Sequence, residues 1–216
     1  MNNAFIFDMD GVIIDSEPVW ERYEQIFLPE LLGKDVYAKI KDQILGNSVS
    51  GIYKAAVQWG FKMTKKEFEQ IYDRYAEIVY EEAKFTDGIQ ELVDKLISIN
   101  FTLGLVSSSR QYWINLVFKK LGSDNIFRCV LSLDSYDRKP KPFPDGYLEA
   151  INLLGSVPEK TIILEDSNRG IQAAKASGAF TICLQENLPK GYLPPNADKY
   201  VTSIRELIQQ IESITI

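Results

Sequence analysis

The sequence predicts an α/β protein, a doubly wound (Rossmann-like) parallel sheet core with an all-helical cap domain inserted after the first strand. Two observations support this fold class. Short apolar segments alternate with segments of helical periodicity in the later part of the chain, which is typical of a parallel sheet with helices on both faces. The first apolar segment is instead followed by several helical patterns in succession before another strand signal appears.

Short apolar segments mark the expected strands. They cover residues 4–8, 101–107, 128–133, 161–166 and 180–184. Each segment is nearly continuous in apolar residues, as expected for strands that are buried on both faces of a parallel sheet. We therefore assign all of these segments to one central sheet.

Apolar stripes with spacings of three and four residues predict a helix before the second strand and helices between the later strands. Their members are Ile89, Leu92, Val93, Leu96 and Ile97; Trp113, Leu116, Val117 and Leu121; Tyr147, Leu148, Ile151 and Leu154; and Ile171 and Ala174. Asp87 precedes the first stripe and is the expected N-cap of that helix. Glycines follow the other stripes, at the position where helices commonly end: Gly122, Gly155 and Gly178.

Residues 16–84 carry helical patterns and no convincing strand. Pro18 suits a helix start, and Thr64 with Glu67 has the spacing of a capping box. The stretch is too long for a connection between two neighbouring strands. We predict that residues 1–15 and 85–216 form the catalytic core and that residues 16–84 form a separate helical cap domain.

The bulk composition limits the possible classes of protein. The chain has 216 residues, of which 45% are hydrophobic and 25% charged, which is ordinary for a soluble globular protein. A net charge of -6 argues against partners such as nucleic acids and anionic membranes. No apolar run approaches the roughly 18 residues of a membrane helix, and the first residues lack the basic region of a signal peptide. We expect a cytoplasmic protein, a monomer or weak dimer, with no nucleic-acid or membrane partner.

Polar side chains follow the predicted strands where ligands bind in such sheets, outside the carboxyl ends. They are Asp8 and Asp10 after the first strand, Ser107, Ser108 and Ser109 after the second, Lys141 after the third, and Glu165 and Asp166 at the end of the fourth. Carboxylate oxygens suit Mg²⁺, whereas lysine and hydroxyl groups suit phosphate oxygens. A carboxylate in such an array can attack phosphorus. The serines can also cap the helix that contains Trp113.

The chain contains no histidine. Nucleophilic triads built on imidazole and zinc sites built on histidine are therefore excluded. Proton transfer has to use carboxylates, lysine, tyrosine or water.

The order of these motifs resembles the haloacid dehalogenase superfamily of phosphotransferases. More narrowly, it is similar to the subgroup with a helical cap after the first strand, which includes beta-phosphoglucomutase and sugar-phosphate phosphatases. The motifs are DMDG (8–11), the serine that ends LVS (105–107), the lysine of KPFPD (141–145) and EDSNRG (165–170).

The resemblance implies a role for each matching residue. Asp8 is implied to be the nucleophile, and Asp10 to be the general acid for the leaving oxygen and the base for the hydrolytic water. Ser107, Ser108 and Lys141 are implied to hold the phosphoryl group. The implied Mg²⁺ ligands are Asp8, Asp10 through its backbone carbonyl, Glu165 and Asp166.

The expected activity is that of a Mg²⁺-dependent phosphatase, which hydrolyses a small phosphorylated metabolite, a sugar or polyol phosphate, through an aspartyl-phosphate. The opening DMDGVIIDSEPVW resembles hexitol and 2-deoxyglucose 6-phosphate phosphatases. The alternative is a phosphomutase of the beta-phosphoglucomutase type. That alternative expects a cap histidine where Trp20 stands and an arginine in the cap loop, whereas residues 45–51 hold no basic residue.

Two further classes fit less well. A signalling receiver domain also collects acids, a hydroxyl and a lysine around Mg²⁺, but it is far shorter and has no cap. A dehalogenase would keep the nucleophilic Asp8 without the other acids at positions 10, 165 and 166.

Overall fold

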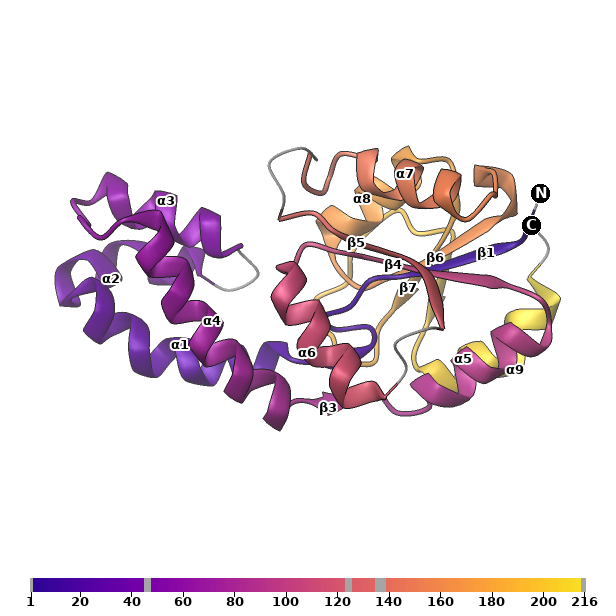
Figure 1. Cartoon of the computed structure of the whole chain (residues 1–216), viewed down its shortest axis with the longest axis horizontal. Helices are drawn as coiled ribbons and strands as arrows, with labels where there is room; N and C mark the ends of the chain where they lie inside the picture. Colours follow the sequence, from indigo (N-terminus) through magenta and orange to yellow (C-terminus); the bar gives the residue numbers. More distant parts are fainter. Residues whose placement is uncertain (1, 45–47, 123–125, 135–138, 215–216) are drawn as a thin grey trace. The chain divides into compact units, whose positions relative to one another are not determined.

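The computed structural model describes residues 2–44, 48–122, 126–134 and 139–214 (Figure 1). The chain divides into two compact units, Met1–Asp15 with Phe85–Ile216, and Ser16–Lys84. The first contains the large sheet and is called the sheet unit below, and the second is the helical unit. Residues 45–47 of the loop in which a mutase would carry its arginine lie outside the described residues.

The sheet unit contains a six-stranded parallel sheet with the order β5-β4-β1-β6-β7-β8, so the predicted α/β fold is confirmed. The strands are β1 (Ala4–Phe7), β4 (Thr102–Ser107), β5 (Phe127–Ser132), β6 (Thr161–Glu165), β7 (Phe180–Leu184) and β8 (Lys199–Val201). After β5 the chain returns to the other side of β1 to form β6. The boundary between β1 and β6 is therefore the topological switch point, where ligands bind in such sheets.

Helices cover both faces of this sheet. They are α5 (Ile89–Ser98), α6 (Gln111–Leu121), α7 (Asp145–Leu153), α8 (Asn168–Ala176) and α9 (Ile204–Gln210), with short 3-10 turns η2 (Pro158–Lys160) and η3 (Ile211–Ser213). Helices α7 and α8 lie on one side, and α5 and α9 pack together on the other (Figure 1). Successive residues of β1 face opposite sides of the sheet. Ala4 and Ile6 belong to the apolar cluster that includes residues of α7 and α8.

Two predicted helix caps are wrong. Helix α5 is preceded by Gly88 in a left-handed conformation (φ 80°), which glycine adopts without steric cost, and Asp87 instead forms an ion pair with Arg205. The serines after β4 do not cap α6, whose N-cap position is occupied by Arg110 without a side-chain cap bond.

The helical unit consists of α1 (Glu17–Leu32), α2 (Lys34–Ile40), the 3-10 turn η1 (Lys41–Gln43), α3 (Val49–Gln58) and α4 (Lys65–Glu82). The predicted capping box of Thr64 and Glu67 starts α4. Aromatic rings form much of the core: Trp20 and Phe27 of α1 lie 5.6 and 5.3 Å from the ring of Tyr72 in α4.

A two-stranded sheet of β2 (Ile14–Asp15) and β3 (Lys84–Phe85) marks the segments where the chain leaves the sheet unit and returns to it. Cys129 and Cys183 are both buried, and neither forms a disulfide. Among the described residues, no helix combines the length and apolar character that are needed to cross a membrane.

Candidate active site

Asp8 lies at the switch point of the sheet. It follows the last residue of β1, and its backbone amide donates to the carbonyl oxygen of Leu164 in β6 over 3.0 Å. The preceding residue, Phe7, pairs with Leu105 of β4 on one side and with Leu164 of β6 on the other. The carboxylate is therefore set between the carboxyl ends of two neighbouring strands, and the residue is only 7% exposed.

Lys141 connects the ends of β1 and β6. Its ammonium group donates to Asp8 Oδ1 over 2.6 Å and to Glu165 Oε1 over 2.5 Å. A third, longer contact of 3.3 Å reaches the carbonyl oxygen of Val106. Lys141 is itself buried, so this charge is placed by the surrounding structure rather than free in solvent.

The pKa values of these groups show how the buried charges balance. Burial raises the pKa of Asp8 to about 7, although the Lys141 ammonium acts in the opposite direction. Burial also acts to raise the pKa of Glu165, but the Lys141 charge and the hydrogen bonds to Glu165 outweigh it and hold that pKa below its usual value. The two carboxylates raise the pKa of Lys141 well above its usual value, although burial alone would lower it. The Lys141 ammonium and its hydrogen bonds therefore outweigh the effect of burial at Glu165 but not at Asp8.

A third carboxylate completes an acidic cluster. Ligand oxygens of Asp8, Glu165 and Asp166 all lie within 4.8 Å of one another. Three carboxylates beside a single lysine leave an excess of negative charge, and closely spaced carboxylate oxygens are the ligands that hard divalent cations prefer. The residues present therefore fit Mg²⁺.

Asp10 has a different environment from these three acids. Its Oδ2 accepts a hydrogen bond of 2.5 Å from the hydroxyl of Ser109, and its side chain is not part of the acidic cluster. Asp10 is only partly buried, whereas Asp8 and Glu165 are buried. Asp10 therefore lies outside the acidic cluster and is bonded to the turn that follows β4.

The serines after β4 form a turn. Ser107 is buried, and its Oγ accepts from the backbone amide of Ser109 over 3.0 Å, whereas Ser108 is exposed. The hydroxyl of Ser132, at the end of β5, donates to the carbonyl oxygen of Ser109 over 2.7 Å. The turn is held on both sides, and it presents hydroxyl groups beside the carboxyl end of β1.

Comparison with known proteins identifies the family. The family model described as haloacid dehalogenase-like hydrolase matches residues 5–184, most of the chain. The chain belongs to this family. The resemblance noted in the motifs is therefore confirmed, and the protein is a hydrolase.

Several relatives of this hydrolase are similar along most of their length. Hexitol phosphatase B of Escherichia coli K12 is 29% identical over 94% of this chain and 93% of its own. A phosphorylated carbohydrates phosphatase of Thermotoga maritima is 29% identical, with 81% of each chain covered. Among solved structures, CbbY from Rhodobacter sphaeroides in complex with phosphate shares the fold, with a TM-score of 0.77 and 19% identity over 96% of both chains.

The hydrolase site contains residues that the sequence analysis did not identify. The hydroxyl of Tyr147 donates to Glu165 Oε1 over 2.7 Å, although the sequence indicated only a member of an apolar helical stripe. Ser167 donates its amide and its hydroxyl to Glu165 Oε2, both over 3.1 Å. Its place directly after the two acids was a usable signal, whereas nothing local to Tyr147 indicated its role.

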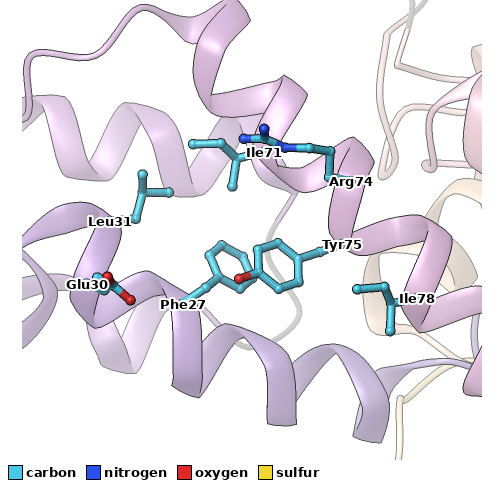
Figure 2. A pocket seen from close by; sticks show the side chains of 7 residues that line it. All are labelled: Phe27, Glu30, Leu31, Ile71, Arg74, Tyr75 and Ile78. Carbon is cyan, nitrogen blue, oxygen red and sulfur yellow. The ribbon is translucent and has the colours of Figure 1, made fainter.

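The helical unit of the hydrolase has a pocket of about 580 Å³ between α1 and α4 (Figure 2). Its lining residues are Phe27, Glu30, Leu31, Ile71, Arg74, Tyr75 and Ile78. The stacked rings of Phe27 and Tyr75 lie 4.1 Å apart. This pocket holds a single acid, Glu30, so its lining offers no set of metal ligands.

Proposed function

We propose that the protein is a Mg²⁺-dependent phosphatase that hydrolyses a sugar or polyol phosphate through an aspartyl-phosphate on Asp8. The observation that carries this proposal is the position of Asp8, which is buried at the switch point, bonded to Lys141 and grouped with Glu165 and Asp166. Relatives named for hexitol and phosphorylated carbohydrate phosphatase activity support the substrate class.

The first step forms a bond between a carboxylate oxygen of Asp8 and phosphorus, and it breaks the bond between phosphorus and the ester oxygen. Asp10 gives its proton to that leaving oxygen. In the second step water attacks the phosphorus of the aspartyl-phosphate, and Asp10 takes a proton from the water. Inorganic phosphate leaves and the Asp8 carboxylate is restored. With no histidine in the chain, Asp10 is suited to both transfers because it is partly exposed and hydrogen-bonded to Ser109.

Positive charge beside the phosphoryl group is the main requirement of this reaction. Lys141 supplies a fixed ammonium beside Asp8, and the hydroxyls of Ser107 and Ser108 would bind phosphoryl oxygens with it. Asp8, Glu165, Asp166 and the backbone carbonyl of Asp10 would hold Mg²⁺, which when bound neutralises charge on those oxygens.

The two units would have different roles in the reaction. We assign residues 1–15 and 85–216 to the catalytic core and residues 16–84 to a cap domain that selects the substrate. The catalytic acids and Lys141 all belong to the sheet unit, whereas the helical unit contributes none of them. Choice among phosphorylated metabolites would then depend on side chains of the cap.

A phosphomutase of the beta-phosphoglucomutase type is the less favoured alternative. Trp20 stands where that alternative expects an imidazole, and it is 7% exposed and packed against Tyr72 in the aromatic core of the helical unit. A residue in that environment stabilises the unit and has no basic group to offer a sugar hydroxyl. Water is therefore the expected acceptor of the phosphoryl group.

The test is an assay of the purified protein against a panel of sugar and polyol phosphates with Mg²⁺, in which released phosphate and isomerised substrate are both measured. We expect phosphate release, and we expect Asp8→Asn to retain less than about a hundredth of it, because an amide is not a nucleophile toward phosphorus. Isomerisation faster than phosphate release would favour the mutase, and an active Asp8→Asn would contradict the covalent mechanism.

A further inference from the structure

One side chain of the loop after β7 contacts the loop that follows β1 and contains Asp10. The amide nitrogen Nδ2 of Asn187 donates to the carbonyl oxygen of Gly11 over 3.0 Å and to the hydroxyl oxygen of Thr86 over 2.9 Å. All three residues belong to the sheet unit. A single amide group thus ties together three segments that are far apart in the sequence.

Both acceptors lie at the segments where the chain leaves and re-enters the sheet unit. Gly11 follows Asp10, and Thr86 directly follows β3. The backbone amide of Thr86 in turn donates to the carbonyl oxygen of Ile13 over 3.0 Å, and the amide of Gly11 donates to the carbonyl oxygen of Ile14 over 2.8 Å. The loop of residues 9–14 is therefore closed on itself and held to Thr86, and Asn187 holds both.

The position of Gly11 matters for the acidic cluster. Its φ of 78° lies in the left-handed region, and a Cβ built on it would be 1.9 Å from Asp166 Oδ2. The Gly11 backbone therefore lies directly against the Asp166 carboxylate, with Asp10 as the preceding residue. A shift of Gly11 would move the Asp10 backbone and change the space that Asp166 occupies.

The segment that presents Asn187 is itself fixed. The amide of Gln185 donates to the carbonyl oxygen of Val201 in β8 over 2.9 Å. The carboxylate of Glu186 accepts from the amide of Ile204, at the start of α9, over 2.8 Å. Asn187 is thus held by the far edge of the sheet and can act as a fixed donor toward Gly11 and Thr86.

We propose that Asn187 is a positioning residue for the phosphatase reaction. Its two N–H groups hold the Asp10–Gly11 backbone against Asp166. The inference rests on the proposed function for its effect on rate, and on the hydrogen bonds alone for its effect on the loop. The chemical requirement is two donors on one short neutral side chain, which asparagine meets and aspartate, of nearly the same shape, does not.

Three variants of the full chain separate donation from space filling. Asn187→Asp keeps the shape and loses the donors, Asn187→Ala loses both, and Gln185→Ala is the control in the same loop. Turnover of p-nitrophenyl phosphate with Mg²⁺ is measured together with hydrogen–deuterium exchange of the Gly11 and Thr86 amides. We expect kcat to fall about 10- to 100-fold in both Asn187 variants, with KM changed less than about threefold and both amides exchanging faster. Gln185→Ala should match the wild type.

The outcomes distinguish this proposal from the proposed function. A wild type without phosphatase activity refutes the proposed function, whereas normal exchange of both amides in Asn187→Asp refutes the positioning role. Wild-type kcat in Asn187→Asp also refutes it, because a residue that only fills space is replaced well by aspartate. If the Asn187 variants fail to fold, Thr86→Val removes one acceptor and keeps the Gly11 bond. It should then show a smaller fall in kcat and faster exchange at Thr86, and an unchanged kcat with unchanged exchange overturns the proposal.

Discussion

Gly170 leaves the space that the Glu165 carboxylate occupies, because a Cβ built on Gly170 would lie 1.8 Å from Glu165 Oε1. Gly170 is in the first turn of α8, where its amide donates to the hydroxyl of the N-cap residue Ser167 over 3.0 Å. The same Oε1 accepts from Lys141 and from Tyr147. The first turn of α8 therefore packs directly against the Glu165 carboxylate, and at position 170 only glycine, which has no side chain, leaves room for that carboxylate.

Gly170→Ala should displace the Glu165 carboxylate or the first turn of α8. We expect phosphatase activity to fall at least about tenfold, and the free energy of unfolding to fall by about 1–3 kcal/mol, as is usual for an overpacked interior. Turnover, Mg²⁺ titration and thermal unfolding measure these effects. Gln172→Ala, on an exposed position of the same helix, is the control and should change none of them. An alanine variant with wild-type kinetics would mean that Glu165 can move without consequence.

Tyr147→Phe should weaken catalysis without emptying the space that the ring fills. It removes the donor to Glu165 Oε1 and keeps the ring, whose centroid lies 5.3 Å from Lys141 Nζ. A hydrogen bond to a charged group contributes about 1.5–3 kcal/mol, and about 1.4 kcal/mol is a factor of ten in rate, so we expect a loss of about 10- to 100-fold in kcat and a weaker affinity for Mg²⁺. Tyr200→Phe is a matched control, because it removes a hydroxyl that bonds the Pro194 carbonyl oxygen instead. Equal activity losses in both variants would point to general destabilisation.

Removal of the cation should abolish phosphatase activity, and Asp166→Asn should raise the Mg²⁺ concentration needed for half-maximal rate by at least about tenfold. The reason is that the cluster of Asp8, Glu165 and Asp166 would lose one of its three charged ligands. Mg²⁺ binding followed by calorimetry gives the same comparison without turnover. Full activity in excess chelator would exclude a metal-dependent mechanism.

Glu24→Gln should stabilise the protein at neutral and higher pH. Burial raises the pKa of Glu24 from 4.5 to about 7, with smaller contributions from the charges of Glu17 and Glu21, although the hydrogen bond from Tyr72 (2.8 Å) acts to lower it. Because the folded state holds the proton more tightly, the free energy of unfolding falls as pH rises from about 4.5 to 7 and is constant above that range.

The loss due to Glu24 is on the order of 3 kcal/mol, since its folded-state pKa of about 7 lies well above 4.5 and each pKa unit corresponds to about 1.4 kcal/mol. Glutamine cannot ionise and keeps an oxygen for the Tyr72 hydroxyl, so thermal unfolding of Glu24→Gln should depend less on pH between 5 and 8. Glu30→Gln, exposed on the same helix and not among the charges that act on the pKa of Glu24, is the control and should follow the wild type. Parallel pH profiles for Glu24→Gln and the wild type would show that Glu24 is ionised throughout this range.

Much of the fold was predictable because strand and helix signals are local. The segments 161–166 and 180–184 carry enough consecutive apolar residues to identify β6 and β7 within a residue. β8 was missed, because only one of its three residues, Val201, is fully buried. The N-cap prediction at Asp87 failed because the backbone needs a left-handed residue at position 88, which outweighs the preference of aspartate for caps.

The sequence by itself determined which residues end the strands, and so which acids and hydroxyl groups meet at one edge. Asp8, Ser107 and Glu165 follow from strand position alone, because the carboxyl ends of parallel strands share one edge. Only the tertiary structure decided which of them touch. Lys141 follows β5, which is not a neighbour of β1 or β6, yet its ammonium reaches the acids after both strands. Tyr147 and Asn187 likewise acquire their partners only from the packing of a helix and the anchoring of a loop. Such contacts depend on strand order and on the path of each connection, and no local periodicity encodes either of them.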